Sequence, residues 1–272
     1  MNSSTVFGRS RVEVKSAEQL AHMRSAGLVV AAALAACTEA VQPGITTADL
    51  DAIAAEVIGD AGAKPSFLGY FDYPATVCVS VNDEVVHGIP GPRVLHDGDL
   101  VSIDCGAIVS GWHGDAAVSV GVGRLAPDVA TLSTVTEEAL WAGITASTVG
   151  ATVGDVGAAI AARVHAANAG YGIVAGYTGH GIGSQMHMDP NVPNIGRPGR
   201  GLTLAAGMAI AIEPMVTLAG NRVRELDDGW TVVTKNGVTA AHWEHTVAIT
   251  PAGPWVLTAV DGGGLLTGDP LA

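Results

Sequence analysis

The chain has 272 residues, of which 48% are hydrophobic and only 14% are charged. With a mean hydropathy of +0.36, this composition excludes a disordered tail or a coiled coil, and the length allows one large domain or two small ones. The 13 basic residues against 26 acidic ones give a formal net charge of −13, which repels phosphate backbones and argues against binding to DNA.

The cysteines and the N-terminus indicate where the protein works. Cys37, Cys78 and Cys105 are odd in number and form no Cys-x-x-Cys pair, which is typical of a reducing compartment. The first ten residues lack the apolar run of an export signal, and the longest apolar stretch, residues 27–37, has 11 residues where a membrane span needs about 20. We therefore expect a cytoplasmic protein with no membrane attachment.

Helix signals come first along the chain. Ser16-Ala17-Glu18-Gln19 has the form of a capping box, so a helix is predicted to start there and to end before Pro43-Gly44. A second helix is predicted over residues 47–59. Strands are then expected over residues 75–82, 100–108 and 113–121, helices from Pro127 to about 147 and over 154–168, a loop-rich stretch over 190–201, and strands over 209–216, 230–234 and 242–249.

The chain contains an internal similarity. Residues 44–52 have the sequence GITTADLDA and align with GATVGDVGA at residues 150–158, at a constant offset of 106. Two similar halves would each contain two helices and antiparallel strands, and neither half alone could cover both faces of its sheet. Chance similarity between two helix starts is the alternative. Since no low-complexity linker divides the halves, one α+β domain is predicted.

Two aspartates occupy unusual places in the predicted strands. Asp104 lies within Leu100–Gly106, where alternate residues face a buried side, and Asp115 follows the turn at Val109-Ser110-Gly111. If the strands pair about this turn, the two side chains lie opposite or nearly so, with Cβ atoms about 5 Å apart. Like charges at that distance raise each other's pKa, and a divalent cation would reverse the effect. An exposed or turn-capping aspartate is the alternative for either residue alone.

Three more ionisable residues lie in apolar or glycine-rich frames: His180, Glu213 and Glu244. An oxygen-rich ligand set with one histidine suits Mn, Fe, Co or Zn, whereas a structural zinc site would use thiolates. Four carboxylates contribute about −4 and two divalent cations +4, so the charge favours two ions. Gly179-x-Gly181-x-Gly183 lacks the spacing of a nucleotide-binding loop, and its glycines are better explained by close backbone approach.

Taken together, these segments resemble the type I methionine aminopeptidases over residues 13–257. The resemblance is carried by the five predicted ligands in family order and by the segments IEPM at 212–215, EHT at 244–246 and VVHGIP at 85–90. It implies the pita-bread fold, an α+β arrangement of pseudo-two-fold antiparallel sheets covered by helices. It further implies a catalytic domain over residues 13–260, between a short N-terminal tail (1–12) and a C-terminal tail (261–272).

The resemblance also implies a function and a set of roles. The enzyme would hydrolytically remove the initiator methionine from nascent proteins with a small second residue, using two divalent ions (Co, Mn, Fe or Zn). Glu213 would move protons, and His87 and His187 would contact the substrate and stabilise the tetrahedral intermediate. The methionine side chain would be bound by Tyr70, Tyr73, Cys78 and Trp230. Ordinary core residues and loop histidines are the alternative reading of these positions.

Some positions depart from the family pattern. Phe67 stands where relatives often have a cysteine, Phe71-Asp72 replaces a common His-Gly, and Met188 stands where an acid is frequent. The rim of the methionine pocket is therefore expected to differ. The expected partners are N-terminal methionine peptides of nascent chains, with transient ribosome contact through the catalytic domain itself, and a monomer is predicted.

Three other classes of protein have the same fold and are alternatives to the methionine aminopeptidases. Prolidases and proline-specific aminopeptidases share the five ligands, but they usually carry a large N-terminal domain that the residues before Ser16 do not provide. Metal-free pita-bread proteins act as binding modules, and creatinase also works without metal. Because all five ligand positions are filled here, the metal-dependent peptidase is preferred.

Overall fold

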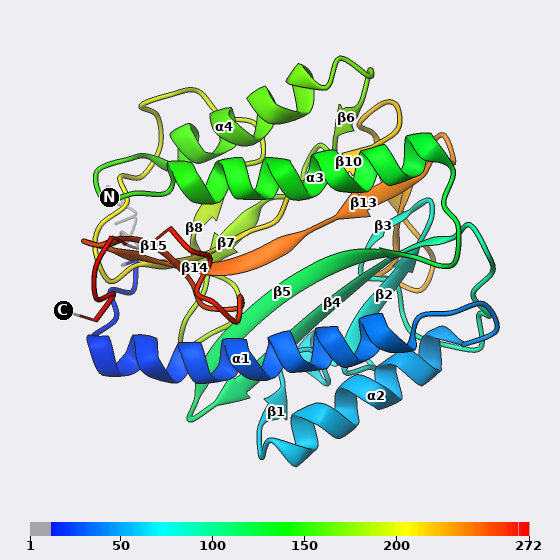
Figure 1. Cartoon of the computed structure of the whole chain (residues 1–272), viewed down its shortest axis with the longest axis horizontal. Helices are drawn as coiled ribbons and strands as arrows, with labels where there is room; N and C mark the ends of the chain where they lie inside the picture. The colour runs from blue at the N-terminus through cyan, green and yellow to red at the C-terminus, as the bar shows by residue number, and fades with distance from the viewer. Residues whose placement is uncertain (1–11, 266, 272) are drawn as a thin grey trace, which may run out of the picture.

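A computed structural model describes residues 12–265 and 267–271 (Figure 1). Most of the predicted N-terminal tail, residues 1–11, lies outside this part, and the domain boundaries at 13 and 260 stay a prediction. The helices of the described part are α1 (Ala17–Ala40), α2 (Thr47–Asp60), α3 (Pro127–Ala146) and α4 (Val153–Ala166), with a short 3-10 helix η1 (Tyr70–Asp72). The predicted helices are thus confirmed to within a few residues at each end.

The local sequence explains where the helices begin. Ser16, Thr46 and Thr152 each cap a helix through a reciprocal capping box with the residue three positions later. Pro127 occupies the first turn of α3, where its missing N–H costs no hydrogen bond. These starts need no tertiary contact, which is why they could be predicted from sequence.

The largest sheet of the described residues runs in the order β1-β4-β5-β14-β9-β7-β8, with β2 also paired to β4 and β15 to β14. Two smaller sheets have the orders β13-β10-β6 and β11-β12-β3. The strands are β1 (Lys64–Pro65), β2 (Val77–Val81), β3 (Glu84–Val86), β4 (Leu100–Val109), β5 (Trp112–Gly121), β6 (Gly172–Ile173), β7 (Gly179–Gly181), β8 (Met188–Val192), β9 (Ala209–Ile212), β10 (Met215–Thr217), β11 (Val223–Glu225), β12 (Val232–Thr234), β13 (Ala240–His242), β14 (Glu244–Thr250) and β15 (Gly253–Val256).

Two strand predictions and one loop prediction need correction. The predicted strand 209–216 is two strands, because Pro214 has no N–H to donate and the chain changes sheets there. The predicted strand 242–249 is likewise divided, and Trp243 separates β13 from β14. Finally, β8 extends to Val192, into the stretch predicted to be loop.

The hairpin of β4 and β5 confirms the predicted pairing of the two aspartates. Val109 pairs with Trp112, so the turn consists of Ser110 and Gly111, both with positive φ (51° and 82°), as a two-residue hairpin turn requires. Asp104 pairs with Ala117, whereas Asp115 pairs with Gly106. The two carboxylates therefore share one face of the sheet as diagonal neighbours rather than directly opposite ones.

The internal repeat is structural, so the chance alternative is wrong. The first glycine of each segment, Gly44 and Gly150, adopts a positive φ (99° and 91°). Their N–H groups donate equivalent 2.9 Å hydrogen bonds, to the carbonyls of Leu95 and Leu204 respectively. The two halves meet where β5 pairs with β14, with β4 and β9 flanking this central pair.

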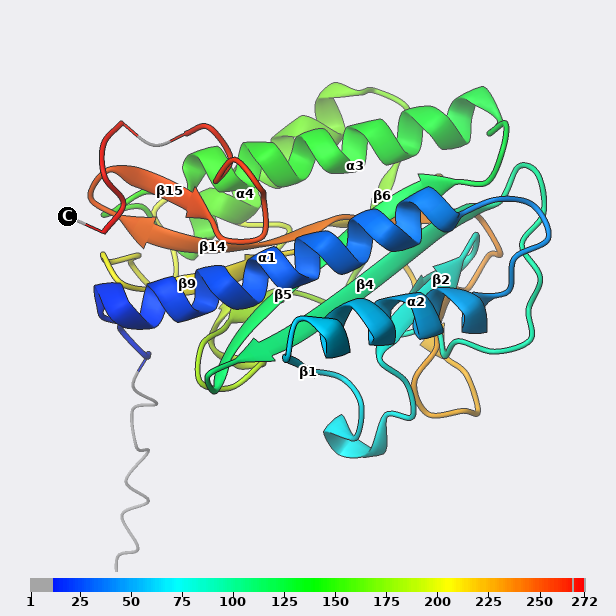
Figure 2. The same ribbon diagram turned by 60° about the horizontal axis from the view of Figure 1, so that its bottom comes forward.

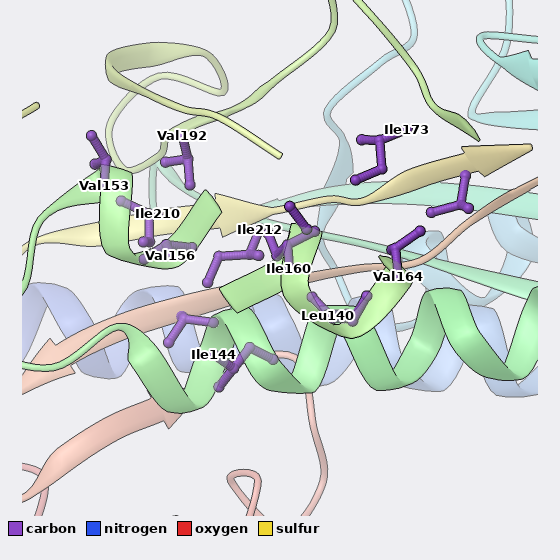
Figure 3. Close-up of a cluster of buried hydrophobic side chains, with 14 of the residues drawn as sticks. Leu140, Ile144, Val153, Val156, Ile160, Val164, Ile173, Val192, Ile210 and Ile212 are labelled. Carbon is purple, nitrogen blue, oxygen red and sulfur yellow. The ribbon is translucent and has the colours of Figure 1, made fainter. Parts of the chain in front are cut away.

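Helix α1 packs on β4 and β5 of the large sheet, whereas α3 packs on β9 and β14 of the same sheet and on β10 and β13 of a smaller one (Figures 1 and 2). In β4, Val101 and Ile103 belong to the core beneath α1 and α2. Figure 3 shows the corresponding core of the second half, in which Ile210 and Ile212 of β9 lie among side chains of α3 and α4. Because side chains alternate along a strand, the intervening residues face away from the helices.

Helix α1 is long and apolar enough to cross a membrane by length and composition alone, which is weak evidence for a span. In this structure it packs as a core helix. A Cβ on Gly27 would lie 2.2 Å from the Leu257 carbonyl oxygen, and a Cβ on Gly114 would lie 2.7 Å from the Gly27 nitrogen. Glycine at both positions lets the helix backbone approach the sheet.

Arg24 of α1 holds the segment after β15 in place. Its guanidinium carbon lies 5.9 Å from the centre of the Trp255 ring. Its nitrogens donate hydrogen bonds of 2.5–3.2 Å to the backbone carbonyls of Val256, Leu257, Ala259 and Val260.

We expect Arg24→Met to lower the free energy of unfolding by about 2 kcal/mol, because the carbonyls lose a charged donor while the apolar stem is kept. Denaturant unfolding measures the effect, and Arg222→Met, at an exposed arginine, is the matched control. Equal stability of the two variants would contradict this assignment.

Candidate metal centre

One cavity contains every predicted site residue. It is formed on the face of the large sheet that points away from the helices. Its lining residues are Phe67, Tyr70, Tyr73, Cys78, His87, Asp104, Asp115, His180, Met186, His187, Glu213, Trp230 and Glu244.

Each predicted ligand is placed by a strand or by the end of one. Asp104 lies in β4 and Asp115 in β5, so the hairpin fixes their relative position. Glu213 directly follows β9, and Glu244 is the first residue of β14, opposite Ala117. His180 is the middle residue of β7, which pairs with β9. The five side chains thus come from neighbouring strands of one sheet.

The carboxylates are buried with unsatisfied oxygens. Asp115 is 3% exposed and Glu244 is 2% exposed. Asp104 Oδ1, Asp115 Oδ1 and Glu244 Oε1 are buried without a hydrogen-bond partner. Burial raises the pKa of all four cluster carboxyl groups, and the charge of Asp104 raises that of Asp115, Glu213 and Glu244 further. Buried acids in this state need either protons or a cation.

His180 is oriented as a neutral ligand. Its Nδ1 lies 3.0 Å from the Gly181 carbonyl, which leaves Nε2 on the side of the carboxylates, 3.6 Å from Glu213 Oε1. Burial, and then the charge of His187, lowers the pKa of His180 to about 3, so the imidazole is uncharged at neutral pH. Ligand atoms of Asp115, His180 and Glu244 all lie within 4.8 Å of one another.

These residues fit a divalent metal centre. The donors are carboxylate oxygens and one imidazole nitrogen, the set preferred by Mn, Fe, Co and Zn in enzymes. No lysine or arginine is among the lining residues, so nothing in the described cavity wall neutralises the acids. A bound cation would satisfy the orphaned oxygens and remove the repulsion.

His87 and His187 stand at the edge of the carboxylate cluster. His87 has a left-handed backbone (φ 61°), and its ring lies 6.1 Å from the Trp230 ring. The ring of His187 lies 4.3 Å from that of His180, and its Nδ1 is 2.9 Å from the Tyr70 hydroxyl. This hydrogen bond fixes the ring plane and leaves Nε2 as the free nitrogen.

The opposite wall of the cavity is apolar. Tyr73 packs edge-to-face on Trp230 (4.9 Å) and on Phe67 (6.5 Å), and its hydroxyl donates to the Val77 and Gly88 carbonyls over 3.1 Å. The backbone therefore satisfies its polar atom. Phe67 and Met186 belong to this wall as well, although they were not among the predicted pocket residues.

His242 was missed by the sequence analysis. It is 2% exposed, and its unpartnered Nε2 lies 3.8 Å from Glu213 Oε2 and 3.9 Å from Glu244 Oε2. Alternation along one strand could not have found it, because His242 ends β13 in a smaller sheet whereas Glu244 begins β14 in the large one.

The departures from the family pattern lie partly outside the pocket and partly in its wall. Phe71 and Asp72 both have positive φ (45° and 65°), and the Phe71 side chain is 77% exposed, so it does not line the cavity. Phe67, in contrast, is buried and does line it.

A curved antiparallel sheet that holds four carboxylates and a histidine in one cavity defines a metallopeptidase of the pita-bread fold. Residues 21–251 match metallopeptidase family M24. The chain belongs to that family and, within it, to the methionine aminopeptidases. It is 56% identical to methionine aminopeptidase 1 of Mycobacterium tuberculosis, over 92% of this chain and 96% of that protein. Its identity to methionine aminopeptidase 1 of Bacillus subtilis is 44%, over 90% and 98% of the two chains.

Solved structures agree with this placement. The crystal structure of a methionine aminopeptidase from Thermotoga maritima matches with a TM-score of 0.89 and 40% identity, over 91% of this chain and 99% of that one. The prolidase from Pyrococcus furiosus shares the fold, with a TM-score of 0.73 and 20% identity, but only 65% of its chain is matched. The pita-bread prediction is confirmed.

We expect metal to stabilise the protein more at about pH 7.5 than at about pH 5.5. In the metal-free protein, the pKa of the cluster carboxyls is raised in the native state. Above about pH 4 the native state therefore binds more protons than the unfolded chain, and the contribution of these carboxyls to the free energy of unfolding falls as pH rises. Metal binding removes these protons, and its apparent affinity grows with pH. Thermal unfolding with Mn²⁺ and with chelator, at both pH values, measures the two shifts. Glu39→Gln, at an exposed acid, should behave as wild type; an identical metal-induced shift at both pH values would argue against the cluster as the site.

Proposed function

We propose that this protein hydrolyses the first peptide bond of nascent chains and releases the initiator methionine when the second residue is small. The observation that carries the proposal is one cavity in which a carboxylate-histidine cluster lies next to an apolar wall. A single amino acid with an apolar side chain and a free amine matches these two surfaces.

Asp104, Asp115, His180, Glu213 and Glu244 would hold two divalent ions, because four carboxylates balance the charge of two such ions. Co, Mn, Fe or Zn would suit these donors. When bound, such ions lower the pKa of coordinated water and polarise the scissile carbonyl.

The protein's own groups would position the substrate and move protons. The Glu213 carboxylate lies 3.6 Å from His180 Nε2 and 3.8 Å from His242 Nε2. Glu213 is therefore placed to accept a proton and pass it to the leaving amine. His87 and His187 would donate hydrogen bonds to the substrate carbonyl as it becomes tetrahedral. The Tyr70 hydroxyl holds His187 in one orientation for this task.

The methionine side chain would lie against Tyr70, Tyr73, Cys78 and Trp230. Aromatic rings and a thiol suit the flexible, polarisable thioether. Phe67 and Met186 complete this wall, so the pocket ends in apolar residues and accepts one side chain. The acidic cluster beside it would attract the free α-amine, which explains why cleavage is confined to the first residue.

We also propose a cytoplasmic location and a monomer that contacts the ribosome transiently through its catalytic domain. The three cysteines are free and buried, as expected in a reducing compartment.

A peptide panel tests the function. With Mn²⁺, Co²⁺ or Fe²⁺, the purified protein should release free methionine from Met-Ala-Ser but not from Met-Lys peptides or X-Pro dipeptides, because the resemblance to methionine aminopeptidases implies a small second residue. Amino-acid analysis of the products gives the readout. Cleavage of X-Pro substrates without methionine release would instead support the prolidase reading.

Removing single charges tests the cluster. Asp104→Asn and Glu213→Gln should each lower kcat/KM at least about 100-fold, because a ligand or proton carrier is lost. Neither should lower the Tm of the metal-free protein, since each removes one of several repelling buried acids. Circular dichroism and thermal unfolding establish that the fold survives. Full activity of either variant would refute its assigned role.

A further inference from the structure

A second, more open groove begins at the carboxylate cluster. It shares His87, His180, His187 and Glu213 with the cavity of the metal centre. Beyond these residues its walls include Tyr177, Thr178, Met188 and Asn191. Thr178 and Asn191 are exposed, so this groove opens to solvent. The cavity thus has an apolar, closed end and a second, open end.

His87 marks the boundary between the two ends. Its ring centre lies 6.1 Å from that of Trp230 and 6.2 Å from that of Tyr177. Trp230 lines only the closed cavity and Tyr177 only the open groove. A peptide whose first side chain lies against Trp230 can therefore leave past His87 along the wall that contains Tyr177.

We propose that the open groove is a binding site for the third residue of the peptide substrate, and that Tyr177 and Met188 select an apolar side chain there. This inference rests on the proposed function and names a specificity element of the same site.

The character of the two side chains supports this preference. Tyr177 is half-buried and packs against the apolar cluster that contains Val86 and Met215, so its ring is held in place. Met188 is also half-buried, and its unbranched side chain adapts to different apolar shapes. Asp189 lines the groove outside the predicted metal ligands, and the charge of Glu225 acts on Tyr177. An acidic third residue would therefore enter a negative region without gaining apolar contact.

Three substrates that differ only in the third residue test the proposal: Met-Ala-Leu-amide, Met-Ala-Gly-amide and Met-Ala-Asp-amide. Partial burial of leucine should raise kcat/KM about fivefold over glycine, and aspartate should lower it about threefold. Met188→Glu should reduce the leucine preference to about one and increase the discrimination against aspartate. Met188→Ala should reduce the leucine preference without changing the aspartate effect.

Val149→Glu is the matched control, because it adds the same charge at an exposed valine that does not line the groove. It should keep the wild-type ratios. Equal rates for the three substrates, or equal ratios in Met188→Glu and Val149→Glu, would overturn the groove assignment while methionine release leaves the proposed function intact. If no substrate releases methionine, the proposed function fails and the groove assignment fails with it.

Discussion

Repulsion among four carboxylates in one buried cavity is the constraint to which the rest of the structure responds. The backbone must hold these groups together without metal, and strong hydrogen bonds between the central strands do so. The Asp115 N–H donates to Thr246 Oγ1 over 3.0 Å, and that hydroxyl donates back to the Asp115 carbonyl over 2.7 Å. Ser119 and His242 make a second reciprocal pair between Oγ and the backbone, at 2.8 and 3.0 Å. The strand carrying Asp115 is thereby fixed to the strand that leads to Glu244.

The internal repeat explains how such a cluster can arise from a regular sheet. Residues 98–104 align with residues 207–213 at an offset of 109, and each segment ends in an acid, Asp104 or Glu213. In each segment the alternate residues before the acid face the core under a helix pair, so both acids face away from the helices. Because β5 and β14 pair at the junction of the halves, equivalent acids from both halves meet.

Much of this arrangement follows from local sequence. Capping boxes, the Ser110-Gly111 turn and strand alternation predict the helices, the main hairpin and the face on which each acid lies. They do not predict which distant strands pair, since β7 joins β9 through only one paired position and β10 leaves the large sheet at Pro214. The five candidate ligands could be predicted from ionisable residues in apolar or glycine-rich frames, and the family resemblance supported their meeting at one centre. His242 was missed because its proximity to Glu213 depends on contacts between sheets.

The symmetric sheet provides the metal ligands, whereas other segments provide the residues that recognise the substrate. Metal ligands need equivalent positions on paired strands, which the repeat supplies, whereas recognition of one chain end needs unlike walls. Those walls come mainly from connecting segments: the one around η1 carries Phe67 and Tyr70, and the one after β7 carries Met186 and His187. Loops change with little effect on the sheet's hydrogen bonds. The departures from the family pattern, Phe67, Phe71-Asp72 and Met188, lie in or at the ends of these segments. Substrate preference can therefore diverge in this protein while the geometry of the carboxylate cluster is kept.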